Sequence, residues 1–136
     1  MLRKSSFQEP HIWLGFFADF RDPTVLLSGT PASMRMLLQA MQRFAAGADD
    51  LFAIHELAFV ALRDSVPLYA TKSSDALPNA FCWQWGPMYS EEHLEKFEAL
   101  VTHGRGHQYF DLIDQQADLV LSIGEYDEQW WRAHSS

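Results

Sequence analysis

The amino-acid sequence predicts an α+β domain, in which a mostly antiparallel sheet of about six to seven strands carries two amphipathic helices packed on one face. Two observations lead to this prediction. Two long segments repeat apolar residues every three or four positions, as helices do, whereas several shorter segments alternate apolar and polar residues, as strands do. In chain order the segments give β-β-α-β-β-β-α-β-β. The 136 residues contain no linker, so we expect one domain spanning residues 1–136.

The first two strands are predicted at His11–Phe20 and Thr24–Ser28, because both runs are rich in aromatic and β-branched residues. Arg21–Pro23 separates them, and proline suits a turn because it cannot donate a hydrogen bond to a strand ladder. Side chains of the first strand should alternate between two faces. One face would carry Ile12, Leu14, Phe16, Ala18 and Phe20, and the other Trp13, Gly15 and Phe17.

The first helix is predicted between Thr30 and Gly47. Thr30 is a good N-cap, Pro31 fits the first helical position, and Gly47 supplies a C-terminal stop. An apolar stripe at helical spacing joins these ends and should face the core. The stripe consists of Met34, Leu37, Leu38, Met41, Phe44 and Ala45.

The segment Leu51–Leu62 fits neither period cleanly. We favour a strand, since Phe52 and Ile54 suit a pleated surface, and a buried helix remains the alternative. Two further strands are predicted at Pro67–Lys72 and Phe81–Trp85.

The second helix is predicted at Ser90–His103, with Ser90 as its N-cap and Gly104 just past its end. The last two strands are expected at His107–Leu112 and Leu119–Ile123. Gly124–Asp127 then turns the chain into a short final segment, to which the sequence assigns no element.

The acidic balance of the chain restricts its partners. The net charge is -8 and the pI is near 5.0, which opposes binding to nucleic acid and to anionic membranes because both are polyanions. The same charge favours a basic protein partner. No run of residues approaches the length of a membrane span.

Cysteine usage and the N-terminus indicate a reducing compartment. The single cysteine, Cys82, excludes an internal disulfide and a cysteine-based zinc cage. Met1–Pro10 lacks the apolar stretch of a signal peptide. We therefore expect a cytoplasmic protein.

A metal site is one alternative that the residues leave open. His103 and His107 flank two glycines, and Asp111 or His55 could complete a ligand set for a small metal-dependent hydrolase. The glycines indicate a bent loop, however, and His103 is well explained as a favourable cation at a helix C-terminus. His55 and Glu56 are adjacent, so their side chains diverge, and we expect one buried and one solvated. We therefore predict neither a metal nor another cofactor.

Aromatic and acidic residues gather near the C-terminus and form the candidate partner surface. Tryptophan and tyrosine are enriched in binding hot spots, because they bury a large area and keep a polar group. Trp83 and Trp85 are expected in the core, and one of the two C-terminal tryptophans should also dock on the body of the domain. The candidate surface comprises Glu125, Tyr126, Asp127, Glu128, Trp130 and Trp131.

Four segments carry a resemblance to a known group of proteins. They are Leu27–Pro31, Phe81–Pro87, Gly106–Asp111 and Ser122–Tyr126. This pattern resembles small bacterial proteins of unassigned function, some of which occur among the immunity proteins of polymorphic toxin systems. The resemblance covers about half of the chain in scattered pieces and implies an α+β binding protein whose partner is a toxin domain. It transfers no catalytic residue.

Together these observations favour a non-enzymatic protein-binding domain that recognises a basic partner. The chain has no nucleophile elbow, phosphate-binding loop or basic footprint for nucleic acid. The alternatives are the metal-dependent hydrolase described above and a homo-oligomer that pairs through an exposed strand edge.

Overall fold

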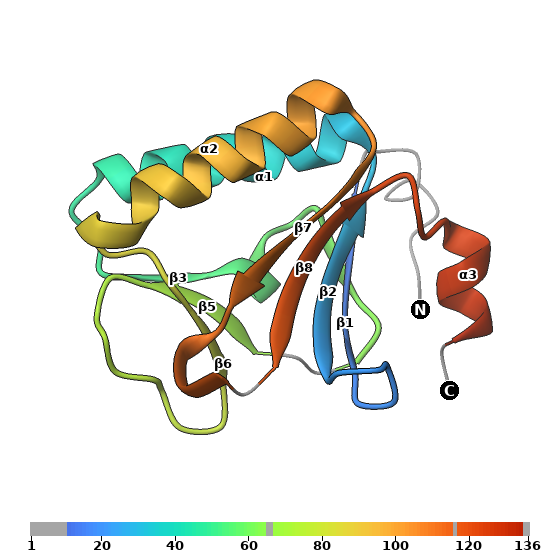
Figure 1. The fold of residues 1–136 in the computed structure, drawn as a ribbon, viewed down its shortest axis with the longest axis horizontal. Coiled ribbons are helices and arrows are strands. Elements are labelled where there is room, and N and C mark those ends of the chain that lie inside the picture. Colours follow the sequence, from blue (N-terminus) through green and yellow to red (C-terminus); the bar gives the residue numbers. More distant parts are fainter. Residues whose placement is uncertain (1–10, 65–66, 116, 135–136) are drawn as a thin grey trace.

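The computed structural model describes residues 11–64, 67–115 and 117–134, and these form an α+β fold (Figure 1). Within those ranges there are eight strands and three helices. The strands are β1 (Ile12–Phe17), β2 (Thr24–Gly29), β3 (Leu51–Ala53), β4 (Val60–Leu62), β5 (Leu68–Thr71), β6 (Phe81–Gln84), β7 (Gly106–Asp111) and β8 (Asp118–Ile123). The helices are α1 (Pro31–Ala46), α2 (Pro87–His103) and α3 (Glu128–Ala133), and two 3₁₀ turns span Ile54–Glu56 and Ile113–Gln115.

The strands form two mixed sheets, so the prediction of one mostly antiparallel sheet is only partly right. The larger sheet has the order β4-β1-β2-β8-β7, and the smaller sheet has the order β3-β5-β6. The pairs β1–β2, β3–β5 and β7–β8 are antiparallel, whereas β1–β4, β2–β8 and β5–β6 are parallel. Neighbours joined by a tight turn must be antiparallel, but strands that meet after a long connection can run in the same direction.

Helices cover both faces of the larger sheet. Figure 1 shows α1 and α2 side by side above the sheets, which confirms that the two predicted helices pack on one side. The third helix, α3, lies on the opposite side of the larger sheet (Figure 1). This helix falls in the final segment to which the sequence assigned no element. We call the side covered by α3 the outer face.

The ends of the helices follow from capping chemistry. At α1 the backbone N–H of Ser33 donates to Thr30 Oγ1 at 3.1 Å, and the N–H of Thr30 donates to Ser33 Oγ at 2.9 Å. This reciprocal capping box confirms the predicted start of α1. The predicted cap of α2 is wrong, because α2 begins at Pro87, so Ser90 lies within its first turn. Pro87 is suited to that position because the first N–H groups of a helix have no intrahelical acceptor.

Leu51–Leu62 is neither a continuous strand nor a buried helix. It is divided into β3, a 3₁₀ turn and β4, and β4 pairs with β1 rather than with β3. His55 lies in the 3₁₀ turn, where Nδ1 is 3.1 Å from the backbone N of Leu68. Its side chain is largely buried while that of Glu56 is exposed, as expected. His55 therefore holds a bend between the sheets. The expected divergence of the two side chains is not seen, because His55 Nε2 lies 3.8 Å from Glu56 Oε2.

The main core lies between α1, α2, the inner face of the larger sheet and the smaller sheet. Ile12 and Leu14 point into it and are fully buried, as are Trp83 and Trp85 of the smaller sheet and its extension. The alternation predicted for β1 is confirmed for residues 12–17, since Phe17 lies on the outer face. Phe20 lies beyond the strand and packs on the outer side, contrary to its predicted face.

A second apolar cluster joins α3 to the outer face. Its buried members are Phe17, Leu26, Val120 and Trp131. The Trp131 ring stacks on Trp13 at 5.6 Å and meets Phe17 edge-on at 5.5 Å. It also lies against Gly15, where a Cβ atom would be 2.9 Å from the ring. Glycine at this position therefore gives the indole room to reach the sheet.

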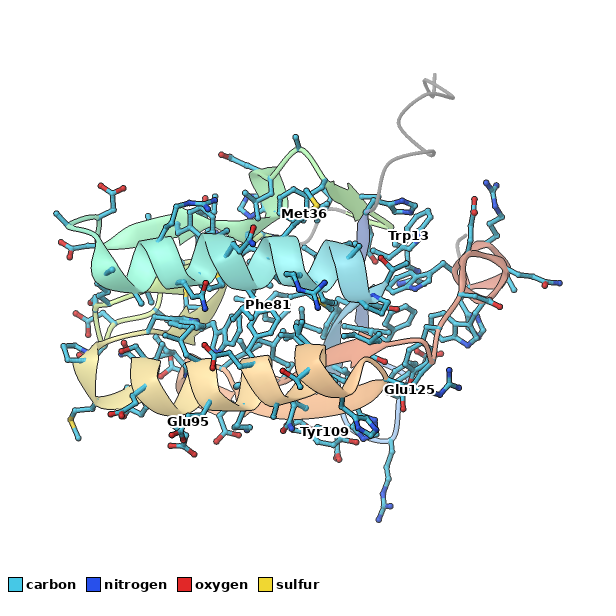
Figure 2. All side chains as sticks on the ribbon, turned by 90° about the horizontal axis from the view of Figure 1, so that it is seen from above. Trp13, Met36, Phe81, Glu95, Tyr109 and Glu125 are labelled. Carbon is cyan, nitrogen blue, oxygen red and sulfur yellow. The ribbon has the colours of Figure 1, made fainter. Side chains whose placement is uncertain are left out.

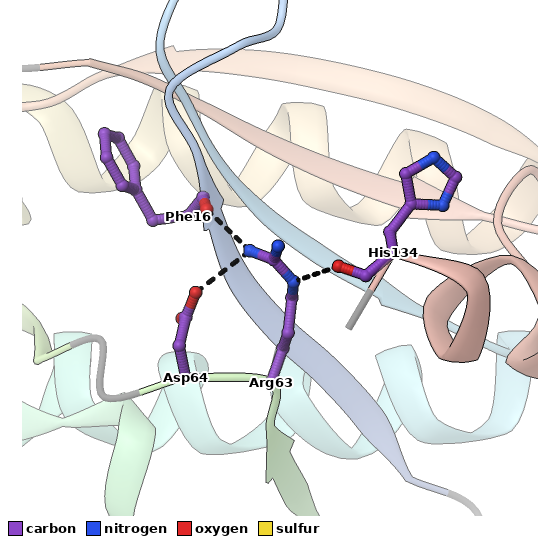
Figure 3. Close-up of polar contacts among 4 residues, drawn as sticks. All are labelled: Phe16, Arg63, Asp64 and His134. Carbon is purple, nitrogen blue, oxygen red and sulfur yellow. Dashed lines mark hydrogen bonds and ion pairs between the residues drawn. The ribbon is translucent and has the colours of Figure 1, made fainter. Parts of the chain in front are cut away.

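Arg63 fastens the end of α3 to the sheet (Figure 3). Its Nε donates to the backbone O of His134 at 2.7 Å, and its Nη1 donates to the backbone O of Phe16 at 2.9 Å. Nη1 also pairs with Asp64 at 3.0 Å, and the guanidinium carbon lies 4.3 Å from the centre of the Phe17 ring. One side chain thus connects the segment after β4, strand β1 and the C-terminus of α3.

Replacement of Gly15 by alanine should displace Trp131. The new methyl group would overlap the indole and lie 3.1 Å from Arg63 Cδ, so we expect a loss of about 1–3 kcal/mol in the free energy of unfolding, measured by chemical denaturation. As a control, the same substitution in a Trp131→Leu background should cost clearly less, because the ring that it meets is gone. Equal costs in both backgrounds would show that this contact is not the cause.

Replacement of Arg63 by lysine should loosen α3. Lysine keeps the charge but has no planar fork, so it cannot donate to both carbonyl groups. We expect a loss of about 1–3 kcal/mol in stability and faster hydrogen exchange of the amides of Trp131 to His134. Asp64→Asn serves as the matched control and should change exchange little. Unchanged exchange in the lysine variant would contradict the role given to Arg63.

Candidate functional site

The outer face carries polar side chains beyond the area covered by α3. In the register of the larger sheet, Trp13 lies opposite Ser28, Ser28 opposite Ser122, and Ser122 opposite His107. Register partners place their side chains on the same face of a sheet. One row therefore runs from the tryptophan on β1, beneath α3, to His107 on the edge strand β7.

Ser122, Glu125 and His107 form a hydrogen-bonded group at the open end of this row. Ser122 Oγ donates to Glu125 Oε1 at 2.6 Å, and His107 Nδ1 lies 2.9 and 3.0 Å from the two carboxylate oxygens. Gly124 adopts a positive φ of 78°, which turns the chain back so that Glu125 lies over β8. Ser28 Oγ donates to the backbone O of Tyr126 at 3.1 Å and secures this turn.

The group fixes the charge of Glu125 and the tautomer of a neutral His107. Partial burial alone would raise the pKa of Glu125, but the hydrogen bonds from Ser122 and His107, together with the charges of His107 and Arg105, lower it below 4.5. The ionised carboxylate accepts a hydrogen bond from Nδ1–H, so Nε2 of a neutral imidazole is left as an acceptor. Burial and the charge of Glu125 raise the pKa of Tyr126, which keeps its phenol protonated.

A hollow of about 750 Å³ opens beside this group. Leu26 and Val120 lie at its base, and aromatic rings contributed by different segments stand around it. Tyr109 is 58% exposed, which is high for a large aromatic residue in a strand. The remaining polar lining comprises Arg21, Asp22, Thr24, His107, Asp118 and Glu125.

Two carboxylates face each other at the end of the sheet next to the hollow. Asp111 of β7 is the register partner of Asp118 of β8, and both lie on the outer face. Like charges directly opposite each other on neighbouring strands are destabilising. Within the described part of the chain, neither of these carboxylates, nor that of Asp22, forms an ion pair. The outer face therefore carries carboxylates that form no ion pair with the described residues.

The structure divides the predicted partner surface into exposed and supporting residues. Glu125 and Tyr126 line the hollow. Asp127 caps α3 by accepting from the N–H of Trp130 at 2.8 Å, and Glu128 pairs with Arg132 one turn later. Trp131 is fully buried, so it supports the surface from beneath. Of the two C-terminal tryptophans, this is the one that docks on the body.

Trp130 is half-buried and stands between α3 and the hollow. Its ring lies 4.6 Å from the ring of Tyr126 and 5.4 Å from that of Phe17. Trp130 therefore positions Tyr126, and only part of its own side chain is exposed to solvent.

The structure gives each residue of the metal alternative a different setting. His103 is exposed at the end of α2, His107 is held by Glu125, and Asp111 ends β7. His55 is bound at the bend beside Leu68. Among the described residues, no three histidine, cysteine, aspartate or glutamate side chains form a group that could hold a metal ion.

Sequence reasoning missed several residues of this region. Asp22 and Asp118 carried no motif, and Ser122 and Tyr109 lay in segments of the resemblance without a role of their own. The strand register brings Ser122, Tyr109 and Asp118 onto one face, and Asp22 lies beside them at the hollow. His93 was also missed, although it precedes Phe97 by four positions and so lies on the apolar stripe of α2.

His93 is enclosed by aromatic rings near the acidic end of the sheet. It lies within 5.6 Å of the rings of Trp83, Trp85 and Phe110, and its Nε2 is 2.9 Å from the backbone O of Gln84. Its Nδ1 is buried and has no hydrogen-bond partner among the described residues. Burial outweighs the hydrogen bond to Gln84 and lowers the pKa of His93 below 6.5.

Comparison with known proteins adds no relative. No family model, no curated protein and no solved structure matches this chain. The resemblance to immunity proteins therefore stays a prediction. None of the helices in the described ranges is long and apolar enough to cross a membrane.

The partly buried imidazole of His93 should make stability depend on pH. Below pH 6.5 the unfolded chain binds a proton at this residue that the folded chain resists, so the free energy of unfolding should fall as the pH decreases from 6.5. We expect His93→Phe to remove up to one proton of uptake on unfolding between pH 6.5 and 5. The measurement is urea denaturation across this range, with His103→Phe as the exposed control. Identical pH slopes for wild type and His93→Phe would contradict the assignment.

Proposed function

We propose that this chain is a non-enzymatic protein-binding domain that recognises a basic partner through its outer face. The binding surface, which we call the acidic face, consists of Asp22, Tyr109, Asp111, Asp118, Glu125 and Tyr126. The observation that carries the proposal is the pair Asp111 and Asp118, which are register partners and form no ion pair with the described residues.

Charge complementarity favours a basic partner. A cationic group placed between the two aspartates would relieve their repulsion, so association improves the electrostatics of the domain itself. The net charge of -8 adds long-range attraction for the same kind of partner. The face would repel a second copy of itself, which argues against self-association through this surface.

The aromatic residues supply apolar contact area, which the carboxylates do not provide. Tyr109 is exposed, and Tyr126 stands against Trp130, which in turn rests on the cluster around Trp131. Side chains held by packing lose little conformational freedom on binding and make good anchors. Seen from the helix side, Tyr109 and Glu125 lie along the rim opposite Met36 (Figure 2). The resemblance to immunity proteins supports a toxin domain as the class of partner.

The proposal predicts that charge reversal on this face abolishes partner capture. Asp22→Lys combined with Asp118→Lys changes two side chains for which the structure shows no side-chain hydrogen bond, so the fold should persist. The immobilised variant, wild type and Asp49→Lys are each incubated with lysate of the native cell. We expect wild type and Asp49→Lys to retain a basic protein from the lysate. The affinity of the double-reversal variant for that protein should be at least about tenfold lower.

Asp49 is a suitable control because it is exposed, lies in the turn between α1 and β3, and does not line the hollow. Circular dichroism verifies that all three proteins are folded. If every protein retained by wild type is retained equally by the double reversal, the acidic face is not the binding surface.

A further inference from the structure

We propose that the hollow on the acidic face receives one arginine side chain of the basic partner. This inference rests on the proposed function and specifies which chemical group the surface takes. The hollow is defined by Phe20, Leu26, Tyr109, Val120 and Tyr126, with the polar groups around them described above.

The base and walls of the hollow match an arginine side chain in shape. Phe20 and Val120 offer an apolar surface for three methylene groups, which long cationic side chains bury readily. The rings of Tyr109 and Tyr126 are positioned to contact a flat guanidinium, which stacks on aromatic rings better than an ammonium does. A volume of about 750 Å³ also admits the residues next to the arginine.

The polar groups of the hollow match the hydrogen-bonding character of arginine. A guanidinium has five N–H donors and no acceptor, so its receptor must provide acceptors. Among the described residues that line the hollow, Asp22, Asp118 and Glu125 provide carboxylates against the guanidinium of Arg21, and the charge of Arg105 also acts on Glu125. Glu125 also orients His107 so that its neutral ring keeps Nε2 as an acceptor.

Ser122 makes the arrangement rigid. It is fully buried and donates to Glu125 at 2.6 Å, which fixes the carboxylate before any ligand arrives. The backbone of the following residue, Tyr126, is held in turn by Ser28. Preorganised acceptors lose less entropy on binding than mobile surface carboxylates do.

The test is an NMR titration of ¹⁵N-labelled protein with the tripeptide acetyl-Gly-Arg-Gly-amide. We expect the amide signals of Tyr109, Val120, Glu125 and Tyr126 to shift with one common saturation curve. The same peptide with citrulline in place of arginine has the same shape without the charge and should bind at least about tenfold more weakly. Equal shifts with both peptides, or no shifts at these amides, would overturn the proposal.

Two substitutions assign the effect to the hollow. Tyr109→Ser should lower the affinity for the arginine peptide about fivefold, because the stacking contact is lost. Asp118→Asn should lower this affinity by a similar factor. Asp49→Asn is the control for a lost surface carboxylate and should leave the affinity unchanged. If Asp49→Asn lowers the affinity as much as Asp118→Asn does, only the net charge of the domain matters. This result would overturn the proposal that the hollow is a specific receptor for arginine.

A free polyamine is the competing source of positive charge, and spermidine tests it. If spermidine shifts these signals and the arginine peptide does not, the hollow is not a receptor for a protein side chain and the inference fails. The proposed function is judged separately by lysate capture. Face-dependent capture without peptide binding would leave the protein-binding domain in place and remove only the arginine assignment.

Discussion

The burial of Trp131 against the outer face of the larger sheet is the contact on which the candidate site depends. Removal of a tryptophan side chain from water corresponds to roughly 4–6 kcal/mol as an upper bound, from about 150–250 Å² at ~25 cal/mol per Å². A six-residue helix would not form in isolation, so α3 exists because this ring is anchored. The anchored helix fixes the preceding turn, and the turn presents Glu125 and Tyr126.

The open half of the outer face is a direct result of the short length of α3. On the inner face, α1 and α2 extend for 16 and 17 residues, and the strands beneath them carry apolar side chains. On the outer face, α3 and its aromatic neighbours cover the area around Phe17 and Leu26. Strand β7 and the beginning of β8 stay uncovered, and there the outward positions are His107, Tyr109, Asp111 and Asp118. The same alternation thus builds the core on one side and the acidic face on the other.

Local signals in the sequence predict the elements well and their pairing poorly. The N-cap of α1 and the end of α2 at Gly104 were predictable, because capping depends on residues within one turn. The pairing of β4 with β1 and the separate smaller sheet depend on contacts between distant segments, for which periodicity gives no information. The helix α3 has a readable cap in Asp127 but is too short for a periodic stripe. Glu125 and Tyr126 were predicted as site residues, whereas Ser122 and Asp118 required the register.

The acidic face combines two properties that favour binding for different physical reasons. Opposed carboxylates on neighbouring strands cost stability in the free domain, roughly 0.2–1 kcal/mol for a pair, and a cation that binds between them removes that cost. Such exposed charges act over a distance and therefore mainly govern the rate of encounter. The rings of Tyr109 and Tyr126 act only in contact and therefore mainly govern the rate of dissociation. Because Asp22, Asp118 and Glu125 line the same hollow as the two tyrosines, long-range attraction and short-range retention would act on the same group of the partner.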